Sequence, residues 1–290
     1  MMKQSQSYKT FTVFNVTFLL LVVFLTLYPF VNIIAQSFSS QEAITAGKVN
    51  LFPVGFNTVT YAAVASDPMF WRNYGNTVLY TVVATAISMV LTTCYAYVLS
   101  KKHIKGRSLL IGVAVFTMFF NGGLIPNYIL ISTLGLKNSI WAVVLPNAIS
   151  VFNLLVMKSF FEGMPNELEE AAAIDGLNQV QTFLRVVLPL SKAVLATMIL
   201  FYAVANWNAW FGAFLYMDKK ELFPVTIYLR NLIAGTSGVH DVGASVDNET
   251  QIAANIKAVT MVLTVLPILT IYPFVQKYFV SGVMLGSVKG

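Results

Sequence analysis

The chain has 290 residues, of which 57% are hydrophobic and only 10% are charged, and its mean hydropathy is +0.72. Soluble domains carry roughly 25% charged residues, so this composition excludes an ordinary soluble domain and indicates an integral membrane protein. The net charge of +6 does not predict a nucleic-acid partner, because most basic residues flank apolar segments, where they suit the anionic headgroups of membrane lipid.

Apolar segments follow one another along the whole chain, and each has at least the roughly 20 residues that a helix needs to cross about 30 Å of hydrocarbon. They do not alternate with polar residues, which favours helices over a β-barrel. We therefore predict an all-α membrane protein in which residues 1–290 form a single transmembrane domain. Its six transmembrane helices are expected at about residues 11–35, 74–100, 108–133, 138–157, 192–216 and 257–280.

Basic residues indicate how the helices are oriented, because Lys and Arg in short loops concentrate on the cytoplasmic side of a membrane. Both termini and the long connection between the fourth and fifth helices are predicted to be cytoplasmic. Residues 36–72 are expected outside as an amphipathic segment with a short helix, and 217–256 as a polar loop. The most basic connection, which joins the second and third helices, contains Lys101, Lys102, Lys105 and Arg107.

The cytoplasmic connection at 159–190 carries dense helix signals. Asn166 followed three residues on by Glu169 is typical of a helix N-cap with a reciprocal acid. Gly176 suits the left-handed backbone conformation that ends a helix. These residues predict a first short helix that stops at Gly176.

A second short helix is predicted after this glycine. Asn178 with Gln181 repeats the start signal. Pro189 disfavours helical geometry at Leu188, so the second helix is expected to end before that residue. The connection is therefore predicted to be a pair of short helices joined at Gly176.

Acidic residues also gather here, because the connection holds five of the twelve in the chain. Three consecutive alanines form a small-residue surface that another protein could approach closely, with carboxylates at its edge for basic groups of a partner. The alternative is a well-capped surface helix that binds nothing. The alanines are Ala171, Ala172 and Ala173, and the acids are Glu162, Glu167, Glu169, Glu170 and Asp175.

The connection also contains a spaced motif: Glu-Ala-Ala, three residues, Gly, nine residues, a β-branched residue, one residue and Leu-Pro. This motif resembles the signature of permease subunits of bacterial ABC importers, with Val186 standing where Ile is usual. Other segments resemble the carbohydrate-uptake branch, and within it the maltose-permease-like second subunit of the polysaccharide or oligosaccharide subgroup. The motif is filled by Glu170, Ala171, Ala172, Gly176, Val186, Leu188 and Pro189, and the other segments include 121–126, 134–139, 160–165 and 276–290.

The resemblance implies the type I ABC importer permease fold, with N- and C-termini in the cytoplasm. In that family this loop forms coupling helices that sit in a cleft on each ATP-binding subunit, and the C-terminal tail reaches toward the ATPase dimer interface. The coupling residues it implies are Glu169, Glu170, Ala171, Ala172, Asp175 and Gly176. The tail, residues 281–290, is expected to contribute Ser287, Val288, Lys289 and Gly290.

The partners implied by the resemblance are a second homologous permease subunit, two ATP-binding subunits, an extracytoplasmic solute-binding protein, an oligosaccharide substrate and the lipid of a bacterial inner membrane. The chain lacks the phosphate-binding loop of ATPases, so ATP and Mg are expected on the partner subunits. We expect no enzyme activity, cofactor or metal in this chain. The scarcity of ionisable residues in the spans argues against a proton symporter, whereas an ion-coupled carrier using backbone carbonyls remains the alternative.

Polar residues inside the expected spans are mainly amides with aromatic neighbours. Amide groups and flat aromatic faces suit the hydroxylated rims and apolar faces of sugar rings, and Asn121, Asn147 and Asn206 are expected at similar depth. The alternative is that these side chains bond across helices as packing contacts. Cys94, the only cysteine, is expected to be a buried apolar residue. The path candidates are Asn121, Asn147, Asn153, Tyr202, Asn206, Trp207, Asn208 and Trp210.

Overall fold

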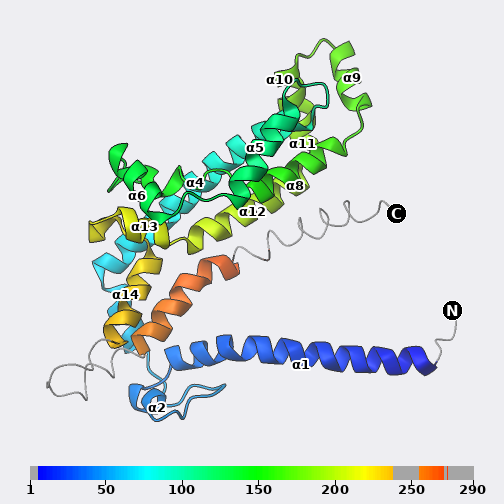
Figure 1. The fold of residues 1–290 in the computed structure, drawn as a ribbon. Helices are drawn as coiled ribbons and strands as arrows, with labels where there is room; N and C mark the ends of the chain where they lie inside the picture. The colour runs from blue at the N-terminus through cyan, green and yellow to red at the C-terminus, as the bar shows by residue number, and fades with distance from the viewer. Residues whose placement is uncertain (1–5, 238–254, 271–272, 274–290) are drawn as a thin grey trace. The chain divides into compact units, whose positions relative to one another are not determined.

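The computed structural model describes residues 6–237, 255–270 and 273, and these residues contain helices and no strand (Figure 1). The chain divides into two compact units. The first contains residues 1–71 and 228–266, and the second contains residues 72–227 and 267–290. The helical fold class is confirmed, whereas the single domain and the count of six spans stay predictions.

The first unit is dominated by α1, Gln6–Ser37, which contains the predicted first span. Its apolar side chains are exposed along most of its length, from Phe11 to Ile34. Such a helix must be covered by lipid or by another subunit, because an apolar surface of this size is not left in water. The unit also contains most of the helix Asn255–Thr270, which is the described part of the expected sixth span.

The segment that follows α1 folds back on the end of that helix. The Asn32 side-chain amide donates hydrogen bonds to the carbonyls of Val49 and Asn50, at 3.1 and 2.8 Å. The Tyr61 hydroxyl donates to the Ser37 hydroxyl at 2.8 Å. Two short helices form in this segment where one was expected, α2 over Gln41–Thr45 and α3 over Val59–Ala65.

The second unit is a bundle in which α4, α5, α8 and α12 run side by side (Figure 1). Short helices gather at its two ends: α9, α10 and α11 lie at one end, and α6 and α13 lie toward the other (Figure 1). The main helices are α4 Pro68–Ser100, which enters this unit at Arg72, α5 Arg107–Phe119, α6 Leu124–Thr133, α7 Trp141–Val144, α8 Val151–Glu162, α12 Lys192–Asn208 and α13 Phe211–Tyr216.

Three of the expected spans are broken rather than continuous. The helix expected over 108–133 is split into α5 and α6, which are bent by 113°. The one expected over 138–157 starts only at α7 and is interrupted at 145–150, and the one expected over 192–216 is interrupted at 209–210. Among the described residues, Tyr8–Ser37 and Pro68–Ser100 alone are unbroken helices long and apolar enough to cross a membrane.

Local backbone chemistry explains two of these breaks. Gly123 has φ +92°, a left-handed conformation that glycine adopts without steric cost, and its N–H donates to the Asn121 side chain at 2.9 Å. Pro146 lies in the second break, where it has no N–H for a helical bond. We name residues 120–123, 145–150 and 209–210 the break level.

The connection at 217–256 is more ordered than a polar loop over its described part. Lys220–Leu222 forms a short 3-10 helix and α14 covers Val225–Ser237. The Asn76 amide donates to the Glu221 carbonyl at 2.7 Å, and the Tyr80 hydroxyl donates to the Leu222 carbonyl at 2.8 Å. These contacts hold 217–224 on α4, a tertiary interaction that composition does not reveal.

A row of small polar side chains is buried along α4 at helical spacing. Such residues let neighbouring helices approach closely and bond across their interface. This row was not predicted from the sequence, although four of the five intervals between its members are four residues long, which is a spacing typical of one helix face. The row comprises Asn73, Thr77, Thr81, Thr85, Ser88 and Thr92, each at most 9% exposed.

Candidate coupling site and translocation path

The first helix of the motif is α9, Glu167–Ile174, and it ends as predicted at a left-handed Gly176 with φ +77°. The N–H of Gly176 donates to the Ala173 carbonyl and the N–H of Leu177 donates to the Ala172 carbonyl, both at 3.0 Å. This pair of bonds is the Schellman arrangement, which closes a helix and requires a residue that tolerates positive φ.

The start of α9 differs from the prediction. Asn166 has helical backbone angles, φ −66° and ψ −26°, and its side chain makes no cap hydrogen bond. The carboxylate of Glu169, expected to reach back to Asn166, forms an ion pair with Lys101 instead. A tertiary contact has therefore replaced the local capping box.

The second helix begins as predicted and continues further than predicted. Asn178 and Gln181 form a reciprocal capping box at the start of α10, Gln179–Thr182, with bonds of 2.9 and 3.0 Å. Leu188 is helical, with φ −61° and ψ −46°, so the expected end before Pro189 is wrong.

A wider helical turn accounts for this continuation. Residues Phe183–Val187 form a π-helix that leads into α11, Leu188–Leu190. A proline ring normally clashes with the carbonyl four residues earlier, and a π-turn displaces that carbonyl. The chain bends only after Leu190, by 82° between Gln179–Leu190 and Lys192–Asn208.

The coupling residues do not share one face of α9. Glu170, Ala171, Asp175 and Gly176 are exposed, whereas Ala172 is only 4% exposed. The alanine at 172 therefore packs inside the chain, and its small size serves close packing rather than partner access.

An apolar surface accompanies the exposed coupling residues. Ile174 at the end of α9 is 87% exposed, and Val180 and Leu184 in the second helix are also exposed. Exposed apolar side chains beside carboxylates are typical of a surface that another protein covers. We name Glu170, Ala171, Ile174 and Asp175 the outer face of α9.

Ion pairs join the segments beneath this face. Besides the Lys101–Glu169 pair, Arg107 pairs with Glu162, which also accepts from Lys158 at 2.9 Å. Burial acts to raise the pKa of Glu162, but Lys158 and Arg107 outweigh burial and hold that pKa below its ordinary value. We name residues 99–107 and 158–190 the coupling end.

Packing beneath the ion pairs is apolar and dense. The Tyr97 ring lies 4.6 Å from the Phe183 ring and 6.0 Å from the Phe161 ring, measured between centroids. Leu99 and Met157, which belong to the same cluster, are fully buried. Such a cluster holds α4, α8 and the π-helix in fixed positions, because close-packed interiors resist deformation.

Several path candidates serve as packing contacts in the described chain. The hydroxyls of Tyr202 and Thr92 share a 2.6 Å hydrogen bond, and the Tyr202 hydroxyl also accepts from the Ser150 N–H at 3.0 Å. Asn206 donates to the Thr85 hydroxyl at 3.4 Å. The same applies to two further buried candidates: Trp207 makes an edge contact with Tyr74, with centroids 5.8 Å apart, and Asn153 lies on the buried face of α8.

The other path candidates lie at the break level. Asn121, Asn147 and Asn208 are all exposed, and each lies within or directly before a break. Asn208 donates to the Val204 carbonyl of its own helix at 2.8 Å. Trp210 lies in the third break and contacts the rings of Phe211 and Phe214. Non-helical backbone at membrane depth is tolerated where it is buried in protein or lines a watery cavity.

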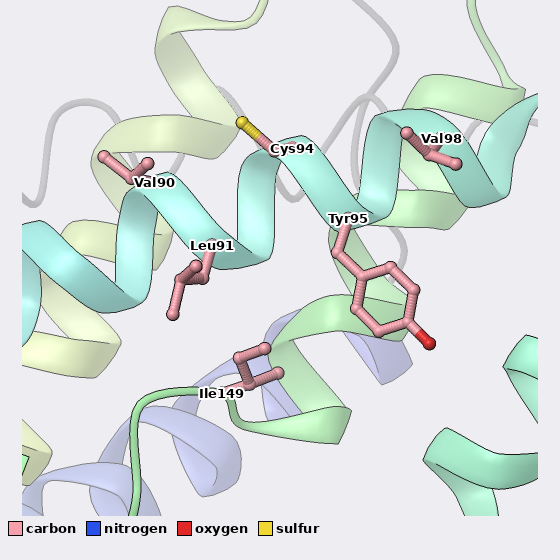
Figure 2. A pocket seen from close by; sticks show the side chains of 6 residues that line it. All are labelled: Val90, Leu91, Cys94, Tyr95, Val98 and Ile149. Carbon is pink, nitrogen blue, oxygen red and sulfur yellow. The ribbon is translucent and has the colours of Figure 1, made fainter. Parts of the chain in front are cut away.

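A hollow of about 420 Å³ on α4 is not a sugar site. Figure 2 shows it lined by Val90, Leu91, Cys94, Tyr95, Val98 and Ile149. Nearly all of this lining is apolar, and the Tyr95 hydroxyl donates to the Leu110 carbonyl at 3.1 Å, so few polar groups are available to orient a sugar. The expected burial of Cys94 is wrong: its side chain is exposed, because the polar row occupies the buried face of α4.

The remaining predicted residues, Ser287, Val288, Lys289 and Gly290, lie outside the described residues. Residues 108–284 match the model of the family described as binding-protein-dependent transport system inner membrane component, which is more than half of the chain. The chain belongs to this family. The inner-membrane, multi-pass location and the type I permease fold predicted from the motif are therefore confirmed, and nothing supports the ion-coupled carrier.

Two curated proteins and one solved structure are similar to this chain over nearly its whole length. Protein LplC of Bacillus subtilis is 41% identical over all of this chain and 98% of its own length. The polygalacturonan/rhamnogalacturonan transport system permease protein YtcP of the same organism is 39% identical over 94% of this chain and 96% of its own. A chain of a bacterial ABC transporter involved in the import of the acidic polysaccharide alginate is 32% identical and superposes with a TM-score of 0.85, covering 96% of this chain and 100% of that one.

Proposed function

We propose that this permease subunit converts ATP hydrolysis in two separate ATP-binding subunits into alternating access for a sugar path. The observation that carries this proposal is the outer face of α9. It presents Ile174, 87% exposed, and the exposed Glu170 carboxylate, and the segments beneath it are held by ion pairs and a buried apolar cluster. An exposed apolar and acidic surface on a rigidly packed segment is suited to bind a partner subunit and to move with it.

The partners follow from the family and from the surfaces that the chain leaves uncovered. The two ATP-binding subunits hold ATP and Mg and dock on the coupling helices, so this chain is not itself an enzyme. A second homologous permease encloses the path, and an extracytoplasmic binding protein delivers the substrate. Each of these ligands shifts the inward and outward states only by its differential affinity for them.

The path is proposed to run along the break level. In many secondary transporters, discontinuous membrane helices form the substrate site, because the breaks expose backbone polar groups, and we apply the same reasoning to the breaks of this chain. Asn121, Asn147 and Asn208 provide amides at such breaks and are exposed in the single chain. Tyr202 and Asn206, whose polar groups are engaged with Ser150, Thr92 and Thr85, support the helices instead.

The substrate is proposed to be an acidic oligosaccharide derived from a polysaccharide. Two relatives point to this class: one is named for polygalacturonan and rhamnogalacturonan, and the other belongs to an importer of the acidic polysaccharide alginate. Exposed basic side chains at Lys219 and Lys220, in the connection predicted to face outward, suit an anionic sugar.

Reconstitution tests this proposal. The chain, its partner permease and the ATP-binding subunits are assembled in lipid nanodiscs, and ATP hydrolysis is measured with binding protein loaded from acidic or neutral oligosaccharides. We expect stimulation by acidic oligosaccharides. Equal or greater stimulation by the neutral set would overturn the substrate class, and substrate uptake into vesicles lacking the ATP-binding subunits would overturn ATP coupling.

Docking of the ATP-binding subunits on the outer face of α9 can be tested separately, by a substitution at Ile174. Ile174→Glu places a charge where an apolar contact is proposed, and it should release the ATP-binding subunits from the purified complex without unfolding the permease, because this side chain is almost fully exposed. Ile174→Val keeps an apolar surface and is the matched control. Retention of the ATP-binding subunits by Ile174→Glu would contradict docking on this face.

A further inference from the structure

Two neighbouring carboxylates of the coupling helix have different surroundings. Glu170 is exposed on the outer face of α9. Glu169 forms an ion pair with Lys101 and accepts a hydrogen bond from the Tyr97 hydroxyl at 3.4 Å. The Lys101 side chain is 20% exposed and that of Glu169 is 35% exposed. The carboxylate of Glu169 is therefore engaged within its own chain and is not presented to a docking partner as Glu170 is.

The Lys101 ammonium is held from more than one side. Its Nζ lies 4.4 Å from the centroid of the Tyr97 ring, an arrangement that favours a cation over an aromatic face. Tyr97 in turn packs on Phe183 of the π-helix. Lys101, Tyr97 and Glu169 thus form one partly buried cluster, in which the ion pair is less screened than a pair in open solvent.

Lys101 also directly follows the last residue of α4, Ser100. The neighbouring carbonyl of Leu99 accepts from Arg107 Nε at 2.7 Å, and the Arg107 guanidinium pairs with Glu162 at the end of α8. Among the ion pairs of the described residues, Lys101–Glu169 is the one that ties α9 to the end of α4. The Arg107–Glu162 pair connects the end of α4 to α8 and does not involve α9.

We propose that Glu169 is a positioning residue that makes α4 move with the coupling helix, rather than a contact to the ATP-binding subunit. The inference rests on the proposed function of α9. Movement of α9 is passed through Glu169 and Lys101 to α4, an unbroken helix. In α4, Thr92 bonds the Tyr202 hydroxyl, which accepts from the Ser150 N–H at the second break. The route therefore ends beside Asn147, in the same break.

Charge exchange tests this route in the complete complex reconstituted in nanodiscs and in vesicles. We expect Glu169→Lys or Lys101→Glu alone to lower the number of substrate molecules imported per ATP at least about fivefold, with the ATP-binding subunits still bound. The double variant restores an opposite-charge pair and should recover most of the wild-type ratio. A purely structural role would lower assembly and leave the ratio unchanged.

Lys102→Glu is the matched control, because Lys102 is the same residue type at the next position and is exposed. Loss of the ATP-binding subunits in Glu169→Lys that Lys101→Glu fails to reverse would assign Glu169 to the docking contact and overturn the proposal. An unchanged import ratio in both single variants would overturn it as well. Failure of the wild-type complex to hydrolyse ATP in response to loaded binding protein would instead reject the proposed function.

Discussion

The coupling end and the break level of the second unit are built in opposite ways. At the coupling end, charged side chains from several segments pair with one another above a buried apolar cluster. At the break level, the exposed amides of Asn121 and Asn208 bond within their own turn or helix. One region is fixed by contacts between elements, whereas the other leaves polar groups accessible.

This difference supports the proposed division of roles, in which the coupling end receives movement from the ATP-binding subunits and the break level contacts the substrate. A region that receives movement from outside must keep its internal geometry, and dense packing with paired charges provides that. A region that admits a hydrated solute needs polar groups that solvent and substrate can reach in turn. Substitutions at buried positions of the coupling end should therefore affect stability and coupling, whereas substitutions of the exposed amides at the break level should affect transport alone.

The largest effect is expected from opening the packed side of the coupling end. Phe183→Ala removes a buried ring that contacts Tyr97, and truncation of a buried Phe costs about 3–5 kcal/mol. Thermal unfolding of the chain in lipid nanodiscs measures this loss. Leu184→Ala is the adjacent control, because that side chain is exposed and should change stability by less than about 0.5 kcal/mol. Similar losses for both variants would contradict the packed arrangement.

A smaller effect is expected at Gly176, where the left-handed conformation holds the turn between the coupling helices. An L-residue in that conformation costs about 1–2 kcal/mol, and no atom lies within 4 Å of the position of an added Cβ. Gly176→Val should therefore strain the turn without a clash and uncouple ATP hydrolysis from import with little loss of assembly. Gly176→Asn is the control, because Asn tolerates positive φ. Unchanged substrate-stimulated hydrolysis in Gly176→Val would contradict this role.

The coupling loop was largely predictable because most of its signals are local. The capping box of Asn178 and Gln181 and the left-handed Gly176 involve residues a few positions apart. The predicted capping box at Asn166 was wrong, because Asn166 has helical backbone angles and Glu169 pairs with Lys101, 68 residues away in sequence. The family motif gave the permease fold, but it did not distinguish the buried Ala172 from the exposed Ala171.

The break level was not predictable from hydropathy. An average over some 20 residues hides a break that one residue causes, such as the left-handed Gly123 or Pro146. The amides at the breaks were identified, but as polar residues inside continuous helices. Tyr202 could not be recognised as a packing residue, because its partner Thr92 lies 110 residues away.

A smaller effect again is expected from the side-chain amides of Asn208 and Asn206, which lie on the same helix. Asn208→Ala, at the exposed break, should leave stability within about 0.5 kcal/mol of wild type and slow import of the oligosaccharide. Asn206→Ala removes the bond to Thr85 and should lower stability by about 0.6 kcal/mol, the average for hydrogen bonds between membrane helices. Unfolding and uptake assays in parallel separate the two effects. If Asn206→Ala slowed import and Asn208→Ala did not, Asn206 would belong to the translocation path and Asn208 would not.

Residues 134–139 and 217–224 of the same unit, in connections predicted to face outward, also contain paired polar and charged side chains. These pairs are fewer and more exposed than those of the coupling end. Asn138 and Asp218 exchange hydrogen bonds of 3.0 and 2.7 Å. Lys137 donates to the Tyr128 hydroxyl at 2.8 Å and lies 3.5 Å from Asp218. The bond from Asn138, together with the charge of Lys137, lowers the pKa of Asp218. The bond to Tyr128 and the charge of Asp218 raise the pKa of Lys137.

The smallest effect on stability is expected from substituting Asp218, and the two pKa shifts determine the pH range in which it should be seen. Because the pKa of Asp218 is lowered on folding, its stabilising contribution is present above its unfolded pKa, about 3.9, and is lost as pH falls through the folded value. Because the pKa of Lys137 is raised on folding, the stabilising contribution of Lys137 is present below its unfolded pKa, about 10.4, and is lost as pH rises through the folded value. Asp218→Asn should therefore lower the unfolding temperature slightly and equally from pH 5 to about 9, with the difference shrinking below about pH 4. Glu221→Gln, an exposed carboxylate in the same connection, controls for loss of charge alone, and a difference that grows as pH falls would contradict the assignment.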